Sequence, residues 1–110
     1  MFARVTTYEL VEGRASESID AFHPAIDHVR ELEGLVDAYF MVERDGRHAM
    51  TMTLWASLDA MERSRVAASS ARTAAASIVA AEVTSTYEFE VAIQVGAADE
   101  MFLGGSRTTS

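Results

Sequence analysis

The one tryptophan of this chain, Trp55, stands where a strand-like pattern gives way to a helix-like one, within TMTLWASLDAMERSR at 51–65. Three small residues precede it on one strand face: Ala49, Thr51 and Thr53. Small residues also recur at helical spacing beyond it: Ala60, Ser64, Ala67, Ala68, Ala71 and Ala75. Small side chains in two layers around one indole leave either a closely packed helix or a cavity. A cavity would suit a flat apolar ligand stacked on Trp55; without one, Trp55 is an ordinary core residue.

A histidine beside an apolar helix stripe is a candidate general base, because imidazole titrates near neutral pH. His23 adjoins Phe22 of such a stripe, so His23 either edges into a pocket lined by Phe22 or lies on its rim. His23 and His28 are five residues apart, which sets them about 140° apart around a helix. Two metal ligands must converge on one face, and we therefore predict no metal site.

Two arginines on one helix face are candidate anion ligands. Arg65 and Arg72 are seven residues apart and share a face. They either bind a phenolate or carboxylate at the mouth of a pocket or form a solvated face with Glu62.

Tyrosines and glutamates on the strands also admit two readings. Tyr39, like Tyr8 and Tyr87, either donates a hydrogen bond to a ligand or packs across strands. Glu88 and Glu90 alternate outward on the last strand, which is typical of the polar face of an edge strand; as a pair they would otherwise suit acid and base catalysis.

Composition narrows the class of protein. The 110 residues carry a formal charge of −8 and no cysteine, which excludes a basic nucleic-acid surface, disulfides and thiolate metal sites. The first residues show neither a basic segment nor a long apolar run, so we expect no membrane span and a cytoplasmic location. One domain over 1–96 is expected, followed by a flexible Gly/Ser/Thr-rich tail at 97–110.

Hydrophobic periodicity predicts four strands and two helices. The strands are expected at 2–11, 35–43, 47–56 and 85–95, and the helices at 17–33 and 58–82.

Local signals mark where these elements begin, end and bend. Ser16 and Ser57 are candidate helix N-caps, and Gly34 suits the position after a helix. Pro24 should kink or divide the first helix. A break in the second helix is expected near 69–70. Asp45 and Gly46 predict a hairpin.

The resulting βαββαβ order favours an α+β, ferredoxin-like fold, a four-stranded antiparallel sheet with both helices on one face. The third strand carries Met50, Met52 and Leu54 on one face and Ala49, Thr51, Thr53 and Trp55 on the other. The pattern alone does not decide which of these two faces meets the helices. An apolar second sheet face needs a cover. We therefore predict a homodimer in which two sheets face each other.

Residues 2 to 95 resemble the antibiotic biosynthesis monooxygenase (ABM) superfamily of dimeric α/β barrels. The likeness rests on LWASLDAM at 54–61, on ELEGLVDAYFMVERDG at 31–46, and on the spacing of all six elements. The resemblance implies a homodimer, a pocket between sheet and helices in each protomer, and either oxygenase activity without metal or flavin or, in some members, haem degradation.

The resemblance also suggests site residues. A tryptophan like Trp55 lines the pocket of the oxygen-using members, usually with an asparagine on the first strand. This chain has no asparagine, and Thr6 lies about where it would be. Haem-degrading members use a histidine on the helix after the tryptophan, where this chain carries Arg65 but no histidine, which argues against haem degradation.

The sequence therefore predicts a cofactor-independent monooxygenase acting on a small aromatic, polyketide or quinol-like compound. Trp55, His23 and Thr6 are the candidate catalytic residues, and the candidate substrate-binding residues are Phe22, Tyr39, Arg65 and Arg72. Two alternatives remain: a non-catalytic binding or accessory protein of the same fold, and a structural dimer with no cavity.

Overall fold

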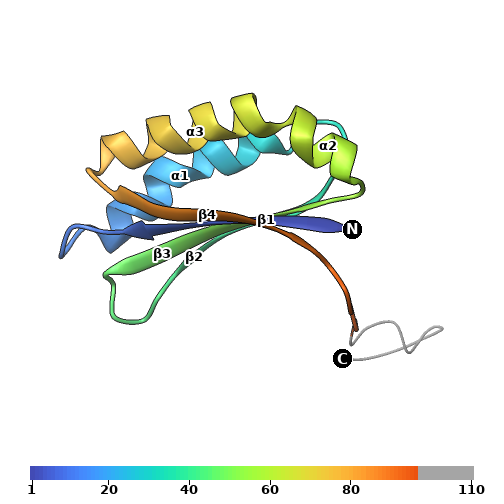
Figure 1. Ribbon diagram of the computed structural model, residues 1–110. Coiled ribbons are helices and arrows are strands. Elements are labelled where there is room, and N and C mark those ends of the chain that lie inside the picture. The colour runs from blue at the N-terminus through green and yellow to red at the C-terminus, as the bar shows by residue number, and fades with distance from the viewer. Residues whose placement is uncertain (97–110) are drawn as a thin grey trace.

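This computed structural model describes residues 1–96 of the chain, and the predicted tail lies outside them. The elements follow in the order β1 Phe2–Glu9, α1 Ala15–Val29, β2 Leu35–Val42, β3 His48–Trp55, α2 Leu58–Arg63, α3 Arg65–Ile78 and β4 Glu82–Glu90. The strands form one antiparallel sheet in the order β2-β3-β1-β4. All three helices cover one face of the sheet and leave the other face bare (Figure 1). The predicted ferredoxin-like fold is confirmed.

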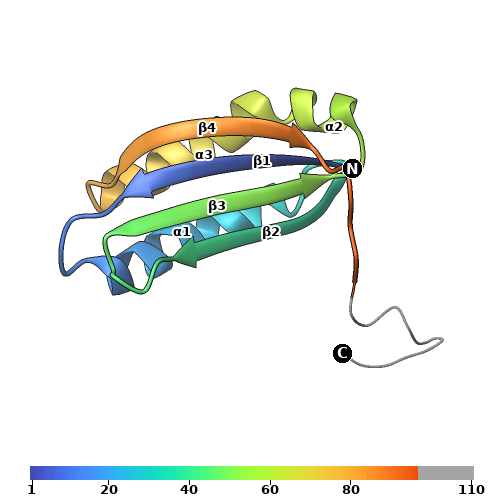
Figure 2. The ribbon, with the colours of Figure 1, turned by 60° about the horizontal axis from the view of Figure 1, so that its bottom comes forward.

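The sheet is seen in Figure 2, with β1 and β3 at its centre. No helix within residues 1–96 is both long enough and apolar enough to cross a membrane.

Several predicted boundaries are wrong, because pairing and packing set them rather than local pattern. The last strand was expected at 85–95, but β4 ends at Glu90, which pairs with Phe2. Only one further bond follows, from the Val91 amide to the Met1 carbonyl at 2.9 Å. Beyond the first residue of β1 there is no neighbouring strand left to pair with.

The first helix also differs from its expected 17–33. It begins at Ala15 and ends at Val29, and its N-cap is Arg14 rather than Ser16. Pro24 lies inside α1 without dividing it. Pro24 is exposed, so water can satisfy the carbonyl group that its missing N–H would have bonded.

The bare face of the sheet is apolar along its middle. One cross-strand row there consists of Tyr39, Met52, Val5 and Tyr87. Tyr39 and Tyr87 are 43% and 57% exposed, so this row is not covered by any other part of residues 1–96.

A bulge at the start of β2 changes which residues face the helices. Strict alternation along β2 would put Val36 on the same face as Phe40, but the register shifts between Leu35 and Asp37. Leu35 therefore packs with the Trp55 cluster, while Val36 is 45% exposed.

The turn between α1 and β2 requires glycine for two reasons. Gly34 has a φ of +87°, and a Cβ built on it would lie 2.3 Å from the Cβ of Ala60. A side chain here would be strained and would also push α2 away from Trp55, against which Ala60 packs.

Gly34→Ala is therefore expected to lower the free energy of unfolding by about 2–4 kcal/mol, from the left-handed conformation plus overpacking. Urea unfolding measures this. Gly13→Ala is the matched control, because Gly13 has a φ of +84° but nothing within 4 Å of its added Cβ. It should show only the conformational part, about 1–2 kcal/mol. Equal losses in the two variants would mean that the contact with Ala60 is unimportant.

Candidate functional site

The helix-facing side of the sheet has a polar centre between two apolar clusters. One cluster surrounds Phe22, which stacks on Phe40 with ring centroids 4.4 Å apart, and the other surrounds Trp55. Between them lie two cross-strand rows. They consist of Thr51, Thr6 and Thr86, and of Thr53, Arg4 and Glu88. Buried polar groups are costly unless they are paired. We call these two rows the polar stripe, because they hold the buried polar side chains that could take part in binding or catalysis.

Arg4 is the central residue of that stripe and is only 2% exposed. Its Nε donates to Glu88 at 3.1 Å, its Nη1 to the Ser64 hydroxyl at 3.1 Å, and its Nη2 to the Met61 carbonyl at 2.7 Å. Its guanidinium carbon also lies 5.8 Å from the centre of the Trp55 ring, within cation–π range.

These bonds place the break in the second helical region at Ser64, not near 69–70 as the sequence suggested. The Ser64 hydroxyl donates back to the Met61 carbonyl at 2.7 Å, and Arg4 donates to the same carbonyl. The last carbonyls of α2 are thus satisfied from outside the helix. At the other end of α2 the Ser57 side chain accepts from the Ala60 amide, so Ser57 is the predicted N-cap.

Trp55 is fully buried and packs against Ala60 and Met61. Its Nε1 donates to the Thr53 hydroxyl at 2.9 Å. The indole therefore lies behind Thr53, one side chain away from the cavity described next, and its stacking on a ligand stays a prediction.

A small chamber lies between the sheet and helices α1 and α3. Its free space is about 20 Å³, room for about one water molecule. It is lined by Arg4, Phe22, Ala25, Ile26, Val29, Thr51, Thr53, Ala68, Ala71 and Arg72. The small residues of α3 that line the chamber, Ala68 and Ala71, therefore leave a cavity, but a narrow one.

Arg72 is the second cation of this chamber. Desolvation lowers the pKa of its guanidinium, and the charge of Arg4 acts in the same direction. Neither a hydrogen bond nor an ion pair joins its side chain to any other residue within 1–96. A half-buried guanidinium without a partner is a site ready for an anion.

Tyr8 adjoins the chamber through Thr51, whose Oγ1 lies 3.0 Å from the Tyr8 hydroxyl. Burial raises the pKa of this phenol, while the hydrogen bond with Thr51 and the charge of Arg72 partly offset the rise. Tyr8 therefore stays protonated at neutral pH and can donate or relay a hydrogen bond, but it is not a base.

Three predicted site residues lie in or beside the chamber. Phe22 and Arg72 line it. Thr6 is 1% exposed and pairs with Thr51 across the strands, and its hydroxyl lies 3.2 Å from that of Thr86.

Three others lie elsewhere. Tyr39 is on the bare face of the sheet. Arg65 is half exposed and binds Glu88 with both Nε and Nη2. His23 has a side chain that is 75% exposed, with Nδ1 3.2 Å from Asp27.

Sequence reasoning missed Arg4 and misjudged Glu88. Glu88 does not belong to an outward polar face, because it pairs with Arg4 across the strands and faces the helices. Contacts with Arg65 and then Arg4 hold the pKa of Glu88 below its usual range, against a smaller opposing effect of burial. Arg4 shares strand alternation with Thr6 and Tyr8, which was the one signal that could have placed it inside.

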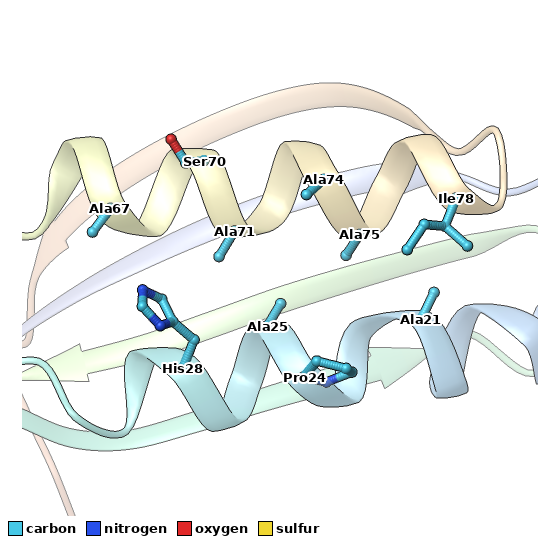
Figure 3. A pocket seen from close by; sticks show the side chains of 10 residues that line it. All are labelled: Ala21, Pro24, Ala25, His28, Ala67, Ser70, Ala71, Ala74, Ala75 and Ile78. Atoms are coloured by element: carbon cyan, nitrogen blue, oxygen red, sulfur yellow. The ribbon is translucent and has the colours of Figure 1, made fainter.

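Two further features lie outside the chamber. Figure 3 shows an apolar groove between α1 and α3, with Ala21, Ala25 and Ala75 pointing into it. At the β2–β3 hairpin, exposed Glu43, Asp45 and His48 bring one ligand atom each within 4.8 Å of the others, and these three could hold a metal ion.

The architecture thus defines an antiparallel sheet of ferredoxin-like topology that holds a cationic chamber under its helices. The sequence model of the family described as antibiotic biosynthesis monooxygenase matches residues 1–76, and the chain belongs to this family. No curated protein matches the chain in sequence.

Solved structures share the fold. SnoaB from Streptomyces nogalater, described as a cofactor-independent oxygenase, is 18% identical with a TM-score of 0.68, over 86% of this chain and 95% of its own. The heme-degrader MhuD from Mycobacterium tuberculosis, solved with two hemes in its active site, is 23% identical with a TM-score of 0.68, over 87% and 100%. A Deinococcus radiodurans protein described as an antibiotic biosynthesis monooxygenase is 13% identical with a TM-score of 0.70, over 87% and 97%.

Proposed function

We propose that this protein is a monooxygenase that oxidises a small aromatic or quinol-like compound as its anion, in the chamber between sheet and helices. The observation that carries the proposal is the Arg72 guanidinium, which no side chain within residues 1–96 bonds, inside a chamber that also holds Arg4. Membership of the monooxygenase family supports the reaction type.

The residues of the chamber favour an anionic substrate. A guanidinium beside a bound phenol or enol stabilises its deprotonated form and so lowers its pKa. Arg72 can therefore lower the pKa of the substrate far enough for water to accept its proton, so no histidine is needed, and His23 lies outside the chamber in a groove with Ile19 and Phe40. Thr51 lines the chamber and is hydrogen-bonded to the Tyr8 hydroxyl, so Tyr8 can relay a hydrogen bond to the substrate through Thr51.

The reaction needs no reductant other than the substrate. A deprotonated CH2 carbon of the substrate passes electrons to O2 and forms a C–O bond, which gives a hydroperoxide. That hydroperoxide loses water and leaves a carbonyl group, so one oxygen atom enters the product and the other leaves in water. Removal of bulk water by Phe22 and Ile26 would protect the anion until O2 arrives.

Substrate entry requires the chamber to widen, because its free space in this conformation is about 20 Å³. The Arg72 side chain is long and only half buried, so its movement is the least costly opening. The alternative function, a non-catalytic binding or accessory protein of the same fold, would need the same opening for its ligand.

None of the three histidines lines the chamber among the described residues. A haem-degrading function would need an axial ligand there. The proposal therefore keeps to an aromatic or quinol-like substrate.

Arg72→Met is expected to reduce kcat/KM for O2 uptake with an anthrone or a dihydroquinone by about a hundredfold, since a desolvated charge partner of the reacting anion is lost. Oxygen-electrode measurements without added flavin or iron would test this. Arg63→Met is the matched control, because Arg63 is exposed and pairs with Asp59 outside the chamber.

His23→Ala is expected to leave O2 uptake unchanged, because His23 lies outside the chamber. A loss of uptake would instead support His23 as the general base that the sequence suggested. A wild-type protein that binds these compounds but consumes no O2 would support the accessory protein instead. Uptake that requires flavin or iron would contradict the cofactor-free reaction.

We further propose that two chains pair through their bare sheet faces. The row of Tyr39, Met52, Val5 and Tyr87 is apolar and uncovered, and an exposed apolar patch of this kind is typical of an interface. Each chamber would then lie on the outer side of its own sheet, away from the partner.

A further inference from the structure

We propose that Arg4 and Arg72 together form a binding site for one small monovalent anion, which during turnover is superoxide. The superoxide part rests on the proposed oxygenase function. The anion site itself rests only on the chamber and its charges.

The charges around the chamber do not balance. Arg4 and Arg65 bind Glu88 directly, Arg72 is affected by the Glu88 charge only at longer range, and no carboxylate within residues 1–96 lines the chamber. Arg65 holds both oxygens of Glu88 from the solvent side, so little of that negative charge is left for the interior. Uncompensated buried charge is costly, and an anion inside the chamber would relieve it.

The chamber also has unused hydrogen-bond donors. A guanidinium carries five N–H groups. Arg4 uses three of them on Glu88, Ser64 and Met61, so two N–H groups of a 98% buried cation are left over. Arg72 adds its whole set.

One hydroxyl completes the donor set. Thr53 Oγ1 accepts the Trp55 N–H at 2.9 Å, so its own hydrogen is free to point into the chamber that Thr53 lines. An anion here would therefore receive hydrogen bonds from two strands and from α3.

The size of the free space selects the occupant. About 20 Å³ admits one water-sized species. A halide or a two-atom anion fits, whereas an aromatic ring does not unless the walls move. Once the walls have moved, the organic substrate would lie in the widened part of the chamber, beside the anion rather than in its place.

A site of this kind has a defined use in the proposed reaction. The substrate anion gives one electron to O2, which leaves a substrate radical and superoxide. Two fixed cations beside the developing charge favour that electron transfer. The radical and superoxide then combine into a C–O bond, the hydroperoxide anion takes up a proton, and water leaves as the carbonyl forms.

Crystals of the full chain soaked in sodium bromide provide the direct test. We expect an anomalous bromide peak in the chamber between Arg4 and Arg72 in the wild type and in Arg63→Met, and none in Arg72→Met. Absence of the peak in the wild type, or its persistence in Arg72→Met, would overturn the site. Arg72 is only partly buried, so this variant should fold even where an Arg4 variant does not.

Solution measurements separate this inference from the proposed function. Calorimetric titration with bromide or chloride should give a dissociation constant at least tenfold weaker for Arg72→Met than for Arg63→Met. In O2 uptake assays, bromide should compete with O2 and not with the organic substrate. Anion binding without any O2 uptake would contradict the oxygenase and its superoxide but keep the anion site. Uptake that bromide does not inhibit, in a protein that binds no anion, would contradict the anion site alone.

Discussion

Arg4→Met is expected to lower the free energy of unfolding by about 3–5 kcal/mol, because it breaks an ion pair and removes the three hydrogen bonds of a buried guanidinium. Glu88 loses its inner partner, and the Met61 carbonyl loses a donor at 2.7 Å. The loss is comparable with the whole stability of many small domains, so partial unfolding at ambient temperature is part of the expected result.

The matched control is Arg65→Met, which removes the other partner of the same carboxylate from the exposed side. Its side chain is 54% exposed, so screening by water should make the loss of stability much smaller than that of Arg4→Met. Urea unfolding followed by circular dichroism compares the two. If Arg4→Met lost no more stability than Arg65→Met, the Arg4 network would not hold α2 and α3 on the sheet.

The order and type of the elements could be predicted because they follow from local pattern. Alternation at β3 and the helical stripe of Phe22 in α1 are both properties of neighbouring residues. Boundaries depend on distant residues instead. β4 ends at Glu90, which pairs with Phe2 at the start of β1. α2 ends at Arg63, where Arg4 bonds the Met61 carbonyl and the Ser64 hydroxyl.

The site was harder to predict because the register between strands decides it. Thr53, Arg4 and Glu88 share one row, although they lie far apart in the sequence. A lone arginine in an alternating strand has no local mark of burial. The same registry places Tyr39 on the bare face, where sequence alone could not distinguish it from a ligand contact.

Register also identifies the centre of the bare face, and with it the substitution that best tests pairing of two chains. Met52 lies on the central strand β3, between Val5 and Tyr39. Met52→Glu would place two carboxylates, one from each chain, near the middle of a face-to-face interface, since an interface of two identical chains repeats every change.

We expect Met52→Glu to weaken the dimer by at least about thirtyfold, since burial of an unpaired polar group costs about 1–3 kcal/mol and two are buried here. Light scattering after size-exclusion chromatography at micromolar concentration measures the mass. Val66→Glu is the control, because Val66 is 81% exposed on α3 and adds the same charge on the opposite side of the molecule. Equal masses for the two variants, or a monomeric wild type, would mean that the bare sheet face meets water rather than a second chain.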